Sequence, residues 1–407
     1  MQNKDRNTYT ATVQASCILV LGIVAVAGLW PFHAPRNRVK WLENENGLRF
    51  GYRGTAVSSG AFRPNHADDQ GPCTLEIWLR PERVTGDSSI LAMDGSVNPR
   101  EPFLLRQYAT GMAVQRYQVD EQGVGIHPWF KINGVFHEGE STFVTITSSK
   151  QRTTVYLNGV LAATSSGVGM ISADLTGRLV LANSTVDDSW TGQIMGLALY
   201  ETELTSTEVM KHFDSWTSSH QPALAVGQQP LAVYLFNEHS GNTVHNQIDP
   251  ATDLVIPKNY FVLHPAFLNP TWVQYARPMN FWTRWSVWQD LGMNIAGFIP
   301  VGFVFMAYFS SVRQAGRAVP AVVLLGFLLS LSIETLQWFL PTRDSGMTDL
   351  LTNTTGTALG VILYRQTTVQ ALLARVVSRI NGPPKISAAA AALAANRLED
   401  ETLSFRT

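Results

Sequence analysis

Cysteine and charge are both scarce in this chain of 407 residues. Its 2 cysteines are Cys17, inside an apolar run, and Cys73, in a distant polar region, and neither has metal-ligand spacing with another Cys or His. A disulfide framework and a zinc site therefore have no support, and both thiols are expected to be buried as small hydrophobic groups. Charged residues make up 15% of the chain and the formal net charge is −1, so we expect no nucleic-acid partner.

Long apolar segments organise the chain instead. Four of them are predicted to be membrane-spanning helices: residues 15–32, 291–312, 318–340 and 349–364. The first could alternatively be a secretory signal cleaved after Ala25-Val26-Ala27, although we favour a retained helix preceded by a short polar segment, residues 1–14. The last is rich in Thr and Gly, and Gly356 and Gly360 give it the small-residue face by which membrane helices approach closely.

Residues 45–257 have a different pattern, with short alternating apolar and polar runs separated by Gly, Asn, Asp and Ser. Examples are residues 73–80, 143–147 and 153–157. The third run is followed by Asn158-Gly159, which supplies the positive φ angles of a tight hairpin turn. Such spacing predicts an antiparallel β-sandwich or barrel.

A linker rich in aromatic residues, 258–288, follows this region. Clusters of Trp and Tyr are favoured in the headgroup zone of a bilayer. The alternative is an aromatic flank packed on the β-sandwich. Residues 367–407 are expected to form a tail outside the membrane.

Basic residues predict the orientation of the helices. The short loop between the second and third spans contains Arg313 and Arg317, and Arg365, Arg375 and Arg379 follow the fourth span. Short basic loops stay in the cytoplasm. Both termini are therefore predicted to be cytoplasmic, and the β-sandwich extracytoplasmic.

In this orientation several polar side chains fall at similar depth near the outer ends of the spans, on the order of 5 to 10 Å below the surface. They are Asn294, Glu334, Gln337, Arg343, Asp349 and Asn353. Ionisable groups are costly at such depths and need a partner or a purpose. The sequence leaves two readings open: the groups bind one another between helices, or they form a polar pocket in the outer leaflet.

The three sequence segments that contain these polar residues together resemble a known family. Asn294-Ile-Ala-Gly-Phe-Ile-Pro-Val-Gly-Phe303, Glu334-Thr-Leu-Gln-Trp-Phe-Leu-Pro-Thr-Arg343, and Asp349 with Asn353-Thr-Thr-Gly356 look like the successive signatures of VanZ-like membrane proteins. The resemblance covers about residues 286–366, with helices in 289–366, and the first span is expected to join them. It implies a role at the bacterial cell envelope, including the reduced susceptibility to glycopeptides of the family's namesake.

The alternating region resembles a concanavalin A-like, laminin-G-like sandwich. Its opening strand resembles Gly47-Leu-Arg-Phe50 and its hairpin Val155-Tyr-Leu-Asn-Gly159, and residues 190–209 look like its closing strand and short helix. Residues 232–241 are similar to a further strand of that family. The expected fold is thus α+β and multidomain: an antiparallel β-sandwich of the concanavalin A-like jelly-roll type plus a bundle of about four transmembrane helices.

The spacing of carboxylates in the β-sandwich favours a binding module over an enzyme. The paired carboxylates that a glucanase would need are missing from the sequence pattern. Calcium could bind at the loop residues Asp94, Asp187 and Asp188, although an exposed loop Asp is more often a turn former. No other cofactor is expected.

We therefore expect a multi-pass protein of the bacterial cytoplasmic membrane that recognises envelope material. Its β-sandwich would bind a glycan, and its polar pocket a lipid-linked or glycopeptide partner, with Arg343 binding a phosphate or carboxylate. One alternative is an intramembrane enzyme that uses Glu334 with Asp349 on an envelope lipid. Another is an adhesion or assembly module on an inert anchor. Enzymatic activity is left uncertain, with binding favoured.

Overall fold

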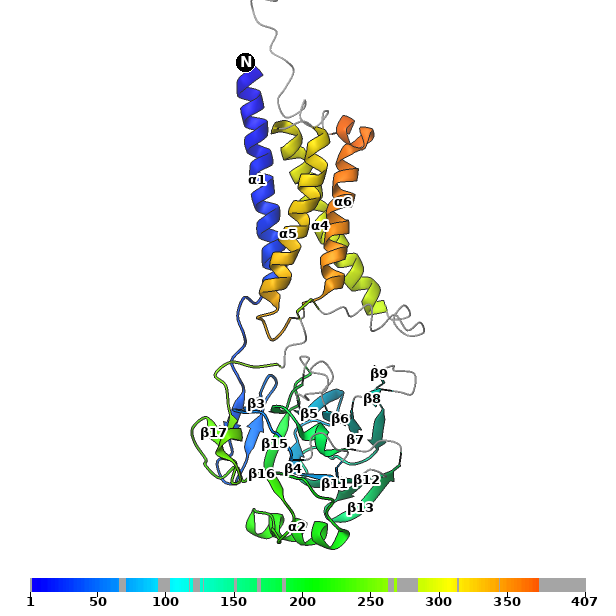
Figure 1. Ribbon diagram of the computed structural model, residues 1–407. Helices are drawn as coiled ribbons and strands as arrows, with labels where there is room; N and C mark the ends of the chain where they lie inside the picture. The colour runs from blue at the N-terminus through cyan, green and yellow to red at the C-terminus, as the bar shows by residue number, and fades with distance from the viewer. Residues whose placement is uncertain are drawn as a thin grey trace, which may run out of the picture. The chain divides into compact units, whose positions relative to one another are not determined.

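The computed structural model divides into two compact units, one of β-strands and one of helices (Figure 1). It describes residues 2–65, 71–93, 103–116, 118–119, 125–126, 128–149, 152–166, 170–184, 188–262, 267–268, 285–312, 315–343 and 345–372. The aromatic linker, the Arg313 loop and most of the predicted tail lie largely outside these residues.

Two antiparallel sheets form the β-strand unit. The first has the order β1 (Val39–Trp41), β2 (Leu48–Phe50), β15 (Gly192–Tyr200), β4 (Cys73–Pro81), β11 (Thr142–Ser149), β12 (Arg152–Leu157) and β13 (Val160–Ser165), with β16 (Pro230–Tyr234) paired to β15. The second has the order β10 (Trp129–Ile132), β7 (Gly111–Gln115), β6 (Phe103–Tyr108), β5 (Asp87–Met93), β14 (Leu179–Leu181), β3 (Ala56–Ser58), β18 (Leu254–Val255) and β17 (Thr243–Val244). A separate pair joins β8 (Gln118–Val119) to β9 (Gly125–Ile126).

One hydrophobic core lies between the two sheets, as the alternating sequence predicts. Leu75, Ile77 and Leu79 of β4 are fully buried in it, together with Leu91 of β5 and Leu105 of β6. Because successive side chains of a strand point to opposite faces, each sheet also has an outer face. The predicted β-sandwich is confirmed.

The predicted hairpin turn is also present. Asn158 and Gly159 join β12 to β13 with φ angles of 50° and 76°. The Asn158 side chain accepts a hydrogen bond from the backbone N–H of Phe143 at 2.9 Å, which ties the turn to β11. This fixes the register of three neighbouring strands.

Helix α2 (Ser206–Ser219) covers part of the outer face of the first sheet. Thr205 caps its first turn through the backbone N–H of Glu208, whose carboxylate accepts from the backbone N–H of Thr205 in return. Trp216 packs over Gly196 of β15, where any larger side chain would collide with the indole ring. The missing side chain of one residue therefore lets the helix lie flat on the sheet.

The helical unit contains α4 (Trp285–Val312), α6 (Met347–Arg365) and all but the last residues of α1 (Gln2–Leu29) and α5 (Ala315–Gln337). Segments of α1, α4 and α5 are long and apolar enough to cross a membrane: Thr10–Leu29, Val287–Ser311 and Ala318–Gln337. Helix α6 is not among them, so the predicted fourth span stays a prediction. The helices end before the predicted limits at Phe32 and Leu340, since Pro31 and Pro341 lie just beyond them.

Small residues bring α4 and α6 together, as predicted. Side chains placed at Gly356 and Gly360 of α6 would overlap the backbone carbonyls of Ile295 and Ile299 in α4. Helix α1 contacts α4 through the Cys17 thiol, which lies 3.6 Å from the carbonyl oxygen of Val304. The contact between α4 and α6 is therefore built on close approach of the two backbones.

Candidate functional site

The structure places two of the predicted polar residues in direct contact. The Asn294 side-chain amide on α4 donates a hydrogen bond of 2.8 Å to the Asp349 carboxylate on α6. Asn353, one turn further along α6, donates to the hydroxyl oxygen of Ser330 on α5 at 3.0 Å. Ser330 and Asn353 are both buried, and the Asn353 side-chain oxygen has no hydrogen-bond partner in the described part of the chain.

The other predicted residues brace the turn after α5. Glu334 is 1% exposed and accepts a hydrogen bond of 2.8 Å from the backbone N–H of Gly346. Arg343 donates to the backbone carbonyl of Trp30 through Nε at 3.2 Å and Nη2 at 2.8 Å. Gln337 is the last residue of α5, and its carbonyl accepts from the backbone N–H of Leu340 at 2.8 Å. These hydrogen bonds go to residues outside the predicted set.

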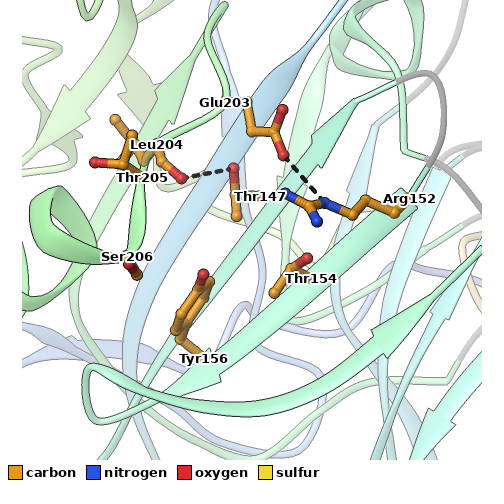
Figure 2. Close-up of a pocket in the computed structure, with 8 residues that line it drawn as sticks. All are labelled: Thr147, Arg152, Thr154, Tyr156, Glu203, Leu204, Thr205 and Ser206. Atoms are coloured by element: carbon orange, nitrogen blue, oxygen red, sulfur yellow. Dashed lines mark hydrogen bonds and ion pairs between the residues drawn. The ribbon is translucent and has the colours of Figure 1, made fainter.

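A pocket in the β-strand unit was not predicted. It has a volume of about 340 Å³ and lies on the outer face of β11 and β12, beside the start of α2. Its lining residues all carry hydrogen-bonding side chains except one leucine: Thr147, Arg152, Thr154, Tyr156, Glu203, Leu204, Thr205 and Ser206 (Figure 2). We call it the strand–helix pocket.

Strand alternation produces the floor of this pocket. Ile146 and Val155 point into the core, so the alternate residues Thr147 and Thr154 point outward, directly opposite each other in the β11–β12 register. Thr147 is held by Thr74, which donates to its hydroxyl at 3.0 Å. Thr154 is only 7% exposed, yet no described side chain or backbone group hydrogen-bonds to its hydroxyl. The floor therefore offers a preformed, available hydroxyl.

Opposite charges form one wall of the pocket. Arg152 Nε lies 3.7 Å from a Glu203 carboxylate oxygen, and their side chains are 62% and 32% exposed (Figure 2). This distance is too long for a strong hydrogen bond, so the guanidinium can still donate and the carboxylate can still accept. The wall is electrically balanced and can bind groups that both donate and accept.

A buried polar network anchors α2 next to the pocket. The Glu76 carboxylate accepts from the Tyr200 hydroxyl at 2.9 Å and the Trp216 indole at 3.1 Å, and it lies 3.0 Å from His212 Nδ1. His212 Nε2 lies 3.2 Å from the Gln228 side-chain oxygen. All four of Glu76, Tyr200, His212 and Trp216 are fully buried, so this network holds the helix rigidly on the sheet.

The network also determines the protonation states of Tyr200 and His212. Burial and the neighbouring Glu76 raise the pKa of the Tyr200 hydroxyl well above its usual value, which keeps it a neutral donor. Burial alone would lower the pKa of His212, but the hydrogen bonds that its ring donates to Glu76 and Gln228, together with the negative charge of Glu76, outweigh burial and raise that pKa. Since both imidazole nitrogens face oxygen acceptors, the geometry also favours the doubly protonated ring.

Of the three calcium candidates, Asp188 lies among the described residues. Asp94 and Asp187 lie outside the described residues. The Asp188 carboxylate accepts from Ser89 at 2.7 Å and Ser184 at 2.8 Å and pairs with Arg106 at 3.1 Å, while burial raises its pKa. Among the described residues, no three His, Cys, Asp or Glu side chains are grouped to hold a metal. Calcium binding stays a prediction.

Comparisons with known proteins cover both units. Residues 54–210 match the concanavalin A-like lectin/glucanases superfamily, and residues 231–372 match the VanZ/LLP1 family. The second match begins well before residue 286, where the sequence resemblance was expected to start. No curated protein sequence matches the chain.

Similar solved structures align with part of the chain. One is a candidate carbohydrate binding protein from Bacteroides ovatus, with 12% identity, a TM-score of 0.39, and coverage of 53% of this chain and 58% of that one. This chain thus spans less than two thirds of that structure. Another is the Ruminococcus gnavus IT-sialidase CBM40 bound to alpha2,3 sialyllactose, with 12% identity, a TM-score of 0.31, and coverage of 41% and 95%. The two family matches, together with the observed sheets and helices, show a chain that combines a concanavalin A-like domain with a VanZ-like helical region.

Proposed function

We propose that this membrane protein binds a neutral saccharide of the cell envelope in the strand–helix pocket. The observation that carries the proposal is the pocket's lining, in which hydrogen-bonding side chains surround the buried, available hydroxyl of Thr154. Each sugar hydroxyl both donates and accepts, and Arg152 and Glu203 supply the two complementary functions side by side. The Tyr156 ring adds an apolar surface against which a sugar ring can pack.

Rigidity supports the same proposal. The pocket is formed by two paired strands and the capped start of a helix, and the buried Glu76 network holds that helix in place. A preformed site loses little conformational entropy on binding. Because the charges in the wall balance, a neutral ligand is favoured over an ionic one.

The helices would hold this domain at the bacterial cytoplasmic membrane, with the domain outside and both termini inside. The support is the apolar spans and the basic residues that flank them. The native cysteines are both buried, so an introduced cysteine gives a clean accessibility signal. In intact cells, a cysteine at Asn158 should react with an impermeant thiol reagent and one at Gly316 should not; the reverse would overturn the orientation.

The polar contacts of the helices support a second role, recognition of a lipid-linked headgroup. The unpartnered oxygen of Asn353 is a buried acceptor available to a donor group of a ligand, near the Asn294–Asp349 bond. An intramembrane enzyme using Glu334 and Asp349 is the competing function. Asp349→Asn should abolish either function while the protein accumulates normally, whereas unchanged function would make these contacts structural braces.

Binding titrations test the pocket. The full chain, purified in a neutral detergent without a sugar headgroup, would be titrated with cellotetraose, chitotetraose and mannotetraose. Thr154→Val should lower the affinity for the sugar by about threefold to tenfold, because one hydrogen bond is lost with little change in side-chain shape. The matched control Thr217→Val alters an exposed hydroxyl on α2 away from the pocket and should leave affinity unchanged. Equal loss in both variants, or binding by neither variant nor the parent chain, would refute the proposal.

A further inference from the structure

A cluster of aromatic rings and one lysine lies on the outer face of the second sheet. Trp129 of β10 and Tyr108 of β6 are 43% and 45% exposed. The Lys131 ammonium lies 4.4 Å from the ring centroid of Trp129 and 4.6 Å from that of Tyr108. One cation is thus held between two exposed rings, and we call these three residues the aromatic–lysine cluster.

The strand register explains how the cluster forms. Phe130 and Ile132 of β10 pack against the core, so the alternate residues Trp129 and Lys131 point to the outer face. Lys131 pairs across the ladder with Ala113 of β7, and Tyr108 pairs with Gly111 of the same strand. Because these two β7 residues are small, the lysine side chain can extend over β7 toward the Tyr108 ring on β6.

In the part of the chain that the structure describes, no carboxylate compensates the charge of the cluster. A neighbouring cation on this face, Arg106, pairs with Ala113 in the sheet register and forms an ion pair with Asp188 at 3.1 Å. Lys131 has no carboxylate within ion-pair distance among the residues that the structure describes. The rings partly stabilise its charge, but they leave the exposed ammonium able to bind an anion.

We propose that the aromatic–lysine cluster is a second binding site, specific for an acidic saccharide of the uronate type. The carbon-bound hydrogens of a sugar ring pack favourably on the exposed faces of Trp129 and Tyr108, and the sugar carboxylate binds the Lys131 ammonium. This chemistry differs from that of the strand–helix pocket, which lies on the other sheet and has balanced charges. The two sites can therefore be tested separately.

Calorimetric titration of the full chain, in the same sugar-free detergent, tests this assignment. The probe is tetragalacturonate, and the matched ligand is its fully methyl-esterified form, which has the same rings without the charges. The variants are Trp129→Ala and Lys131→Gln. Lys211→Gln, which removes an exposed lysine from α2, is the control for a general loss of positive charge.

The unaltered chain and Lys211→Gln should bind the acid at least about tenfold more tightly than the ester. Lys131→Gln should abolish this preference. Trp129→Ala should lower the affinity for both ligands by about tenfold, as expected for an aromatic contact at the centre of a site. Equal affinity of the unaltered chain for acid and ester, a preference that survives in Lys131→Gln, or no binding at all would overturn the proposal. Lys131-dependent binding to phosphatidylglycerol vesicles without binding of tetragalacturonate would also overturn it, by assigning the cluster to a bilayer surface.

Discussion

The β-strand unit and the helical unit bury polar side chains in different ways. In the β-strand unit, the fully buried carboxylate of Glu76 accepts hydrogen bonds from a hydroxyl, an indole and an imidazole. In the helical unit, polar groups meet mostly in pairs, such as Asn294 with Asp349 and Asn353 with Ser330. The first arrangement fixes one rigid structure, whereas the second joins helices one bond at a time and leaves an acceptor of Asn353 available.

The energetic consequence is a difference in how much one polar side chain contributes to stability. Removing one partner of a buried charged network leaves the others uncompensated and costs about 3–5 kcal/mol. Hydrogen bonds between membrane helices average under about 1 kcal/mol. The helices should instead depend on the close approach of their backbones, and three substitutions test this contrast.

The largest effect is expected at the centre of the network. Glu76→Ala should lower the free energy of unfolding of the β-strand unit by about 3–5 kcal/mol, because His212 and two further donors lose their buried acceptor. Urea denaturation followed by near-ultraviolet circular dichroism measures it. Glu138→Ala, at an exposed position, serves as the control. A loss as small as that of the control would mean that the network does not anchor α2.

A smaller but clear effect is expected in the helices. Gly360→Ala should destabilise the contact of α6 with α4 by about 1–3 kcal/mol, because the added methyl group overlaps the carbonyl of Ile299. Gly297→Ala is the matched control, since a methyl group there meets no other atom and should stabilise α4 by about 0.5–1 kcal/mol. Thermal denaturation of the purified chain measures both. The same sign of change in both variants would contradict the proposed backbone packing.

The smallest effect is a dependence on pH. The pKa of His212 is raised in the folded state above its unfolded value of about 6.5, so its contribution to stability is complete below that pH. The contribution is lost as pH rises through the folded pKa, and the β-strand unit should become less stable above about pH 6.5. Denaturation series across this range should show the decline in the parent chain and in His137→Gln, an exposed control, and a smaller decline in His212→Gln.

Local signals in the sequence were sufficient to predict much of the fold. Alternation placed a strand at residues 73–80, and the structure has β4 at Cys73–Pro81. The Asn158-Gly159 pair predicted the hairpin, and Gly356 and Gly360 predicted a close helix contact. In each case one short segment carries both the residue pattern and its physical reason.

The sites were harder to predict because they join distant segments. Thr147 and Thr154 were within predicted strands, but only tertiary structure brings residues 203–206 to them. The alternation of apolar and polar residues could have indicated that both threonines point outward. It could not have indicated that α2 leaves the sheet uncovered at these two residues. One of the two readings paired Glu334 with other side chains of the polar set. The hydrogen bond described for Glu334 comes from the backbone N–H of Gly346, and every residue except proline carries such a group, so residue type could not predict it.

The contact between Cys17 on α1 and Val304 on α4 joins residues 287 positions apart. At a synthesis rate of about 5–20 residues per second, roughly 15–60 s pass between the appearance of the two residues on the ribosome. For most of this interval α1 has none of its helical neighbours, because the strands of the β-strand unit are made before α4 begins at Trp285. In the orientation that we propose, α1 would then lie in lipid without helical partners, and its exposed Ile18, Leu19 and Ile23 are apolar side chains suited to that surrounding.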